Sequence, residues 1–299
     1  MCTTVAKYEG GLYFGRNMDI DGDFGESVRY IPAGYTLSLK QGNPVKFRYA
    51  FMGMGADVDG YPLMADGMNE AGLCAAALNF VGNAFYFDRT AKKGLAPYEL
   101  IPMLLGTCSN IREARDLLDH SELVRIPFSD ELPLSELHFH VADESGSLCF
   151  EQTAEGARIY ENTVGVLANN PPFPWQLERL SDCNYIKNEP SEPVFRELKP
   201  YTKGLWGTGL PGDFSSPSRF VRAAHLLRFS KGEHPIYDVF SLLNSVAVPK
   251  GAVRDESGKL HYTTYQCCMD AAHGVYYCRK YGSLETEALR FDCFKNATH

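Results

Sequence analysis

The sequence predicts a layered α+β domain, and three observations indicate this class. The 299 residues are enough to bury a sizeable core, and 44% hydrophobic with 22% charged residues is typical of a globular protein. Strand-like segments occur at both ends of the chain and in its middle. Helical patterns occur in two separate groups between them. This order favours sheets covered by helices over alternating βαβ units.

The chain opens with a predicted β-hairpin. Residues 4–8 alternate as in a strand, a Glu-Gly-Gly turn follows, and residues 12–16 form the returning strand. The hairpin brings Arg16 and Asp19 back toward Cys2. A guanidinium beside a thiol favours the thiolate, and a carboxylate near the chain terminus can orient its amine.

Further strands are predicted before the first helices. Residues 30–39, 47–54 and 63–68 are short apolar or alternating runs broken by Gly and Pro. The run from Gly72 to Asn79 is nearly continuous in small apolar residues, as in a strand buried on both faces. Asn79 is expected at the end of that strand.

The first helical group covers residues 97–104 and 111–118. Pro97 opens the first helix, and Asn110 with Glu113 resembles a capping box for the second. The second group is predicted from three segments, residues 175–185, 218–229 and 235–246.

The remaining strands follow each helical group. They are predicted at residues 137–142, 148–152, 157–160, 163–167, 261–269, 274–281 and 284–291. Residues 188–200 are rich in Pro and Glu and indicate a long surface loop instead of a linker. We therefore expect one domain over residues 2–299.

Charge and hydropathy exclude several classes of protein. The net charge is −8 and the chain has no basic run, which argues against a nucleic-acid partner. No apolar run approaches the length of a membrane span, and the N-terminus is too polar for a secretory signal. The expected location is the cytoplasm.

The cysteine and histidine patterns predict no metal site. Nine cysteines without a Cys-x-x-Cys pair favour neither a disulfide framework nor zinc. His138 and His140 share one strand face without an evident third ligand, so ordinary strand histidines are the better interpretation. The Asp19-x-Asp21-x-Asp23 spacing lacks the glycine and glutamate of a calcium loop. Five cysteines in apolar strand contexts are expected to act as small hydrophobes, namely Cys74, Cys149, Cys267, Cys268 and Cys278.

Cys2 is the cysteine whose position suits chemistry. It follows the initiator methionine, and a residue this small permits removal of Met1. The freed α-amino group has a reference pKa of about 7.7 to 8.0, against about 8.5 for a thiol. The amine can then take the thiol proton, which is the logic of an N-terminal nucleophile.

Four blocks resemble the choloylglycine hydrolase family, which comprises bile salt hydrolases and penicillin V acylases. They occur in the order of the family and span the chain from Cys2 to Phe220. The blocks are Cys2-Thr3 with Phe14-Gly15-Arg16-Asn17-Met18-Asp19, Ala77-Leu78-Asn79-Phe80, Val166-Leu167-Ala168-Asn169-Asn170-Pro171, and Gly209-Leu210-Pro211-Gly212-Asp213 continuing to Arg219-Phe220.

The resemblance implies a four-layer αββα sandwich and a set of site residues. Cys2 would be the nucleophile, Arg16 would lie beside it, and Asp19 near its amine. Asn79 and Asn169 would lie near the developing oxyanion, and side-chain amides placed there are worth about 2.7 to 4 kcal/mol. Arg219 matches a further arginine of the family, although its local pattern also fits a solvent-facing residue at a helix start.

The implied activity is removal of glycine or taurine from a conjugated bile acid, through a thioester on Cys2. Met18, Ile20 and Phe24, with the segment Tyr201 to Thr208, are candidates for an apolar pocket around the steroid. Asn79 favours the bile salt branch, because penicillin acylases of the family often carry tyrosine at that position.

Three alternatives stay open. Penicillin V and acyl-homoserine lactones suit the same chemistry, and a binding protein that retains Met1 would have a blocked amine.

Amide hydrolysis by a thiol needs no cofactor. The family further implies a bacterial homotetramer.

Overall fold

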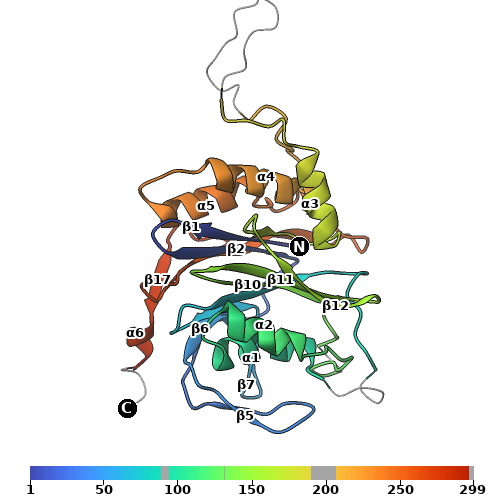
Figure 1. Ribbon diagram of the computed structural model, residues 1–299, viewed down its shortest axis with the longest axis vertical. Coiled ribbons are helices and arrows are strands. Elements are labelled where there is room, and N and C mark those ends of the chain that lie inside the picture. Colours follow the sequence, from blue (N-terminus) through green and yellow to red (C-terminus); the bar gives the residue numbers. More distant parts are fainter. Residues whose placement is uncertain (89–93, 131, 190–206, 296–299) are drawn as a thin grey trace, which may run out of the picture.

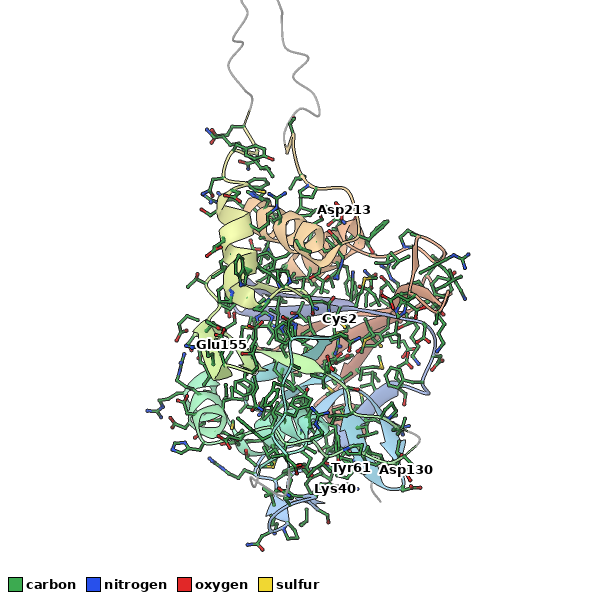
Figure 2. The ribbon with its side chains drawn as sticks, turned by 90° about the vertical axis from the view of Figure 1, so that its right-hand side faces the viewer. Cys2, Lys40, Tyr61, Asp130, Glu155 and Asp213 are labelled. Atoms are coloured by element: carbon green, nitrogen blue, oxygen red, sulfur yellow. The ribbon has the colours of Figure 1, made fainter. Side chains whose placement is uncertain are left out.

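The computed structural model describes residues 1–88, 94–130, 132–189 and 207–295. Two antiparallel sheets stack face to face, and each carries helices on its outer side (Figure 1). The same stack seen from the side has Cys2 near its middle (Figure 2). The predicted α+β class and the αββα order of layers are confirmed.

The first sheet has the N-terminal hairpin near its centre. In the described part of the chain its order is β13-β1-β2-β15-β16-β17, and β14 pairs with β15. Its strands are β1 (Cys2–Tyr8), β2 (Leu12–Ile20), β13 (Val166–Leu167), β14 (Val253–Arg254), β15 (Leu260–Asp270), β16 (Val275–Lys280) and β17 (Glu287–Arg290).

The second sheet follows the order β12-β11-β10-β9-β8-β6-β3, and β7 pairs with β6. Its strands are β3 (Ser27–Ile31), β6 (Phe51–Val58), β7 (Tyr61–Met64), β8 (Asp66–Asn69), β9 (Cys74–Asn79), β10 (Leu137–Asp143), β11 (Gly146–Thr153) and β12 (Gly156–Glu161). A separate ladder joins β4 (Thr36–Leu37) to β5 (Val45–Lys46).

Helices cover the outer face of each sheet (Figure 1). Beside the second sheet lie the 3₁₀ turn η1 (Pro97–Glu99), α1 (Leu100–Thr107) and α2 (Ile111–Asp119). Beside the first lie α3 (Phe173–Ser181), α4 (Ser216–Phe229) and α5 (Pro235–Ser245), and α6 (Phe291–Lys295) follows β17. Among the described helices, none combines the length and apolar composition that crossing a bilayer requires.

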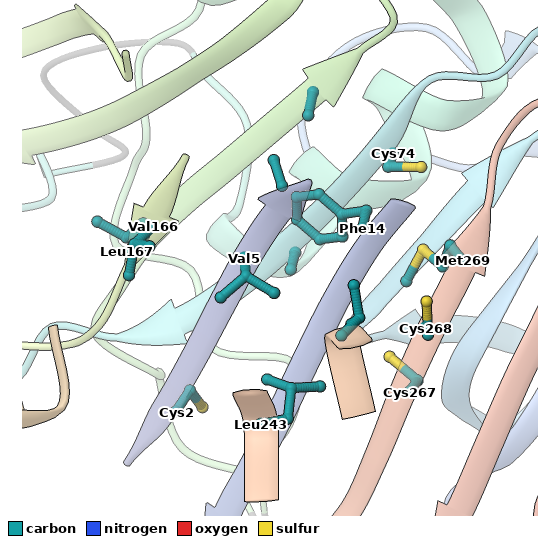
Figure 3. Close-up of a cluster of buried hydrophobic side chains, with 14 of the residues drawn as sticks. Cys2, Val5, Phe14, Cys74, Val166, Leu167, Leu243, Cys267, Cys268 and Met269 are labelled. Carbon is teal, nitrogen blue, oxygen red and sulfur yellow. The ribbon is translucent and has the colours of Figure 1, made fainter. Parts of the chain in front are cut away.

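The space between the sheets is filled by alternate residues of their strands. In β9, Cys74 and Ala76 pack into the core between the sheets, whereas Ala75 packs with the core around α1 and α2. Strand β9 is therefore buried on both faces, as its continuous apolar run predicts. Figure 3 shows this core around Phe14, with Cys2 near its edge.

Gly15 allows the hairpin to approach the helical layer closely. A Cβ built on Gly15 would lie 2.4 Å from Cγ1 of Val239 in α5. Real Cβ atoms do not come this close to another carbon, so glycine is required here for α5 to pack on β2.

Several predicted boundaries differ from the structure for identifiable reasons. The run 30–39 is interrupted after β3, where Pro32 removes a ladder donor and Gly34 has φ +85°. The helix expected at Pro97 starts as a 3₁₀ turn before α1. Asn110 caps α2 as predicted, but the Glu113 carboxylate accepts from the backbone N–H of Ser109 and not from that of the cap residue.

Candidate active site

The register of the N-terminal hairpin determines which side chains meet at Cys2. Cys2 pairs with Met18, and Thr4 pairs with Arg16. Because side chains alternate along a strand, Cys2, Arg16 and Met18 all face the second sheet. Asp19 faces the helical layer of the first sheet, where it meets α4 through Arg219. The site is therefore built on both faces of one hairpin.

Arg16 lies beside the Cys2 thiol and is fully buried. Its Nη2 is 3.4 Å from the Cys2 Sγ and donates to the carbonyl of Ala77 at 2.6 Å. Its Nη1 donates to the carbonyl of Ala65 at 2.5 Å and pairs with the Asp66 carboxylate at 3.1 Å. Burial opposes the charge, but Tyr265, Cys2 and Asp66 raise the pKa of Arg16 well above its ordinary value.

Asp66 holds this guanidinium in place, and sequence reasoning missed it. Its side chain is fully buried at the start of β8, and its two oxygens accept from the hydroxyls of Tyr265 at 2.6 Å and Tyr276 at 2.7 Å. An acidic residue inside the apolar run 63–68 was the available signal, since a buried charge requires a partner. The strand that supplies this partner lies about fifty residues away from Arg16, which no local pattern shows.

Asp19 is near the chain terminus as the resemblance implies. Its carbonyl accepts from the Met1 amino group at 2.5 Å, and its Oδ1 accepts from Thr263 at 2.5 Å. Its Oδ2 is buried and has no hydrogen-bond partner among the described residues. Burial raises the pKa of Asp19, opposed by Arg219 and by the Thr263 hydrogen bond.

Arg219 reaches the backbone of the nucleophile from α4. It is fully buried, and Nη1 donates to the Cys2 carbonyl at 2.6 Å and to the Thr3 hydroxyl at 2.5 Å. Its Nη1 is also 3.8 Å from the Asp19 carboxylate. Burial lowers the pKa of Arg219 despite Asp19 and Cys2. The alternative of a solvent-facing arginine at a helix start is wrong.

Asn169 connects the nucleophile to Asn79. Its Oδ1 accepts from the Cys2 backbone N–H at 2.8 Å and from Arg219 at 2.7 Å. Its Nδ2 donates to the Asn79 carbonyl at 2.8 Å, and no second acceptor for this amide nitrogen is found among the described residues. Asn79 itself lies partly buried at the end of β9 and borders the two cavities described next.

An apolar pocket of about 370 Å³ opens at Cys2. Met18, Ile20 and Phe24 lie on its wall, as the sequence predicts, and residues 201–206 fall outside the described part of the chain. Residues of strands β7 and β10, of η1 and α1, and of loops complete the pocket, among them Leu63, Met64, Ala65, Pro97, Tyr98, Ile101, Phe128, Leu132, Pro133 and Leu137.

A second cavity of about 340 Å³ lies on the other side of Asn79. Asn169, Arg254 and His261 line it together with Met1. Asn79 borders both cavities, whereas Cys2 lines the first and the preceding residue, Met1, lines the second. A larger cavity of about 570 Å³ lies at the far end of β1, next to Tyr8, and contains none of the predicted site residues.

Five further buried cysteines have surroundings that favour the neutral thiol. Burial raises the pKa of Cys74, Cys149, Cys267, Cys268 and Cys278, the last to about 11, so these groups stay protonated near neutral pH. They pack as small hydrophobes, as predicted.

One group in the described part of the chain has the residue types of a metal site. The donor atoms of His138, Cys149 and Glu151 lie within 4.8 Å of one another, and all three residues are buried. Sequence reasoning found no third ligand for His138, because Cys149 and Glu151 come from the neighbouring strand β11. The Nδ1 of His138 is 3.0 Å from Glu151, and the Phe173 N–H also donates to that carboxylate, so protein groups already use these atoms.

This arrangement suits acyl transfer to sulfur. A thiol lies beside a permanent cation, its backbone amide and carbonyl are held by Asn169 and Arg219, and an apolar pocket opens in front of it. A nearby cation favours a thiolate, which is the attacking form of cysteine.

Comparisons with known proteins agree with this geometry. A family model described as linear amide C–N hydrolases, choloylglycine hydrolase family, matches residues 2–295. The chain is 41% identical to a bile salt hydrolase/transferase of Lactiplantibacillus plantarum, over 97% of this chain and 92% of that protein.

Two solved structures are similar as well. A variant of the conjugated bile acid hydrolase of Clostridium perfringens superimposes with a TM-score of 0.90 at 32% identity, covering 98% of this chain and 93% of that one. Penicillin V acylase of Agrobacterium tumefaciens shares the fold, with a TM-score of 0.78 at 23% identity over 97% of this chain and 86% of that one. The chain therefore belongs to the choloylglycine hydrolase family of linear amide C–N hydrolases.

Proposed function

We propose that this protein hydrolyses the amide bond of glycine- or taurine-conjugated bile acids, with Cys2 as the nucleophile after removal of Met1. The observation that carries the proposal is the Cys2 thiol, 3.4 Å from the Arg16 guanidinium at the mouth of an apolar pocket. Support for the substrate class comes from the relatives named as bile salt and conjugated bile acid hydrolases.

The reaction begins with transfer of the thiol proton to the freed Cys2 amine. The resulting ammonium has acceptors nearby, because the Cys2 nitrogen donates to Oδ1 of Asn169 and the adjacent Met1 amine donates to the Asp19 carbonyl. The buried Oδ2 of Asp19, which faces Arg219 at 3.8 Å, has no hydrogen-bond partner among the described residues. The thiolate attacks the amide carbon and forms a tetrahedral intermediate whose oxygen carries the negative charge. Asn79 and the second N–H of Asn169 are the donors we assign to this oxygen.

The intermediate collapses when the C–N bond breaks and the ammonium returns its proton to the departing amine. This step releases glycine or taurine and leaves the acyl group as a thioester on Cys2. Water then attacks the thioester, with the Cys2 amine again accepting the proton, and the free bile acid leaves.

The two cavities orient the substrate. The apolar pocket of about 370 Å³ falls within the size range of small-molecule sites and suits the steroid body. The anionic head group then faces the second cavity, where Arg254 offers a cationic group; His261 also lines this cavity, but its Nε2 pairs with the carboxylate of Asp255 at 3.2 Å. Removal of Met1, which lines that cavity, enlarges it.

The test is release of glycine and taurine from conjugated bile salts by the purified protein. We expect release by the wild type, none by Cys2→Ser, and an unchanged rate for Cys293→Ser, because Cys293 is exposed and lines neither of the two cavities at the site. Absence of release by a protein that has lost Met1 would overturn the substrate assignment and direct the search to penicillin V and acyl-homoserine lactones. Retention of Met1 without activity would favour the binding-protein alternative.

A homotetrameric state and a cytoplasmic location are part of the same proposal. Light scattering of the purified protein measures the first, and fractionation of the producing cells measures the second.

A further inference from the structure

We propose that the buried pair His138 and Glu151 is a positioning device for the two asparagines of the site. This inference rests on the proposed function, because it concerns the donors assigned to the oxyanion. Neither residue lines the cavities at Cys2, so the pair acts through its neighbours and not on substrate.

His138 contacts the residues adjacent to both asparagines. Its Nε2 is 2.8 Å from the carbonyl of Ala168, the residue before Asn169. Its ring stacks on Phe80, the residue after Asn79, with centroids 4.4 Å apart and planes within 3°. One imidazole therefore lies between two chain segments that are ninety residues apart in sequence.

Glu151 fixes the orientation of this imidazole. A carbonyl oxygen can only accept a hydrogen bond. The Nε2 of His138 must therefore carry a proton and donate it in a hydrogen bond to the Ala168 carbonyl. The other ring nitrogen, Nδ1, is 3.0 Å from Oε1 of Glu151. One proton lies between these two atoms, and a buried carboxylate in this position prevents the ring from turning over.

The pair also fixes the segment that follows Asn169. The Phe173 N–H donates to both oxygens of Glu151, at 3.0 and 3.1 Å. Asn169 is thus held on one side through Ala168 and on the other through the start of α3. All three side chains, His138, Glu151 and Phe173, are buried, so solvent does not compete for these bonds.

His140 is the matched control because it lies on the same strand and face. It is equally buried, but its partners are Thr4 at 2.8 Å and Asn162 at 3.2 Å, and neither adjoins Asn79 or Asn169. Replacing either His138 or His140 removes a buried histidine, whereas only the replacement of His138 removes contacts beside Asn79 and Asn169.

The experiment compares His138→Phe with His140→Phe in steady-state hydrolysis of a conjugated bile salt, corrected for the folded fraction. We expect His138→Phe to lower kcat about tenfold to a hundredfold with little change in KM, since small misplacements of catalytic groups have effects of this size. His140→Phe should keep kcat within about threefold. Equal kcat losses in the two variants would refute the positioning role.

A second test uses Asn169→Ala as the background. A residue that acts through Asn169 should have little further effect on kcat once the amide is gone, whereas an independent structural effect should multiply with it. Multiplicative losses would overturn the proposal.

Glu151 provides variants if His138→Phe does not fold. Glu151→Gln can donate to Nδ1 and accept from Phe173, so we expect near-normal kcat, while Glu151→Ala should lose about as much as His138→Phe. Equal activity of the two variants would contradict the proposal, as would a stoichiometric metal ion at this group. If the wild type itself releases no amino acid, the proposed function fails and this inference fails with it. If the wild type is active and only the expected drop is missing, this inference alone is wrong.

Discussion

Removing both partners of the Arg16–Asp66 pair should destabilise the protein by clearly less than the sum of the two single removals. The two charges are 3.1 Å apart and their side chains are 1% and 0% exposed. Breaking a buried pair leaves an uncompensated charge and costs about 3–5 kcal/mol. We therefore expect Arg16→Met and Asp66→Asn each to lower the unfolding free energy by about that amount.

The double variant carries neither charge. Its loss of unfolding free energy should therefore be smaller than the sum of the two single losses by at least about 2 kcal/mol. Urea unfolding, followed by far-UV circular dichroism at one pH, measures the unfolding free energy of the wild type, the two single variants and the double variant. The exposed pair Lys259–Asp21, 2.9 Å apart with side chains 66% and 40% exposed, is the control and should show a coupling below about 1 kcal/mol. Additive losses at Arg16 and Asp66 would refute the reasoning.

Three further predictions concern packing, pH and the pocket. Gly15→Ala should cost about 1–3 kcal/mol of unfolding free energy because its Cβ meets α5, whereas Gly22→Ala, which meets nothing within 4 Å, should change it by less than about 0.5 kcal/mol. Burial, with His138, lowers the pKa of His140 to about 3, so the unfolded chain alone binds a proton as pH falls below about 6.5. The contribution of His140 to stability is therefore complete above that pH. Between that pH and pH 5 the wild type should lose about 2 kcal/mol more unfolding free energy than His140→Phe. Equal losses in urea titrations would contradict this. Phe24→Ala should raise KM for a conjugated bile salt roughly five- to thirtyfold, from about 1–2 kcal/mol of lost apolar contact, while Phe85→Ala, outside the pocket, should leave it unchanged.

Local patterns in the sequence were sufficient for most of the fold. The hairpin, the doubly buried strand β9 and the capped helix α2 follow from alternation, small residues and Asn110, and each is confirmed. The stacking of two sheets came from the family resemblance, because periodicity gives the faces of a strand but not the partner of each face.

The site was predictable where residues lie close in sequence or in a family motif. Cys2, Arg16 and Asp19 share one hairpin, so their proximity follows from its register. Asp66 and the pair His138–Glu151 were not recognised, because their partners lie on other strands and only the packing of the sheets brings them together. His138 was interpreted as an ordinary strand histidine for the same reason.

The most direct test of the central claim is intact-mass spectrometry of the protein quenched in acid during turnover of a conjugated bile salt. The account predicts a chain that lacks Met1 and carries a transient bile acyl group, which peptide mapping places on Cys2. An active protein that keeps Met1, or an acyl group on any other residue, would contradict it.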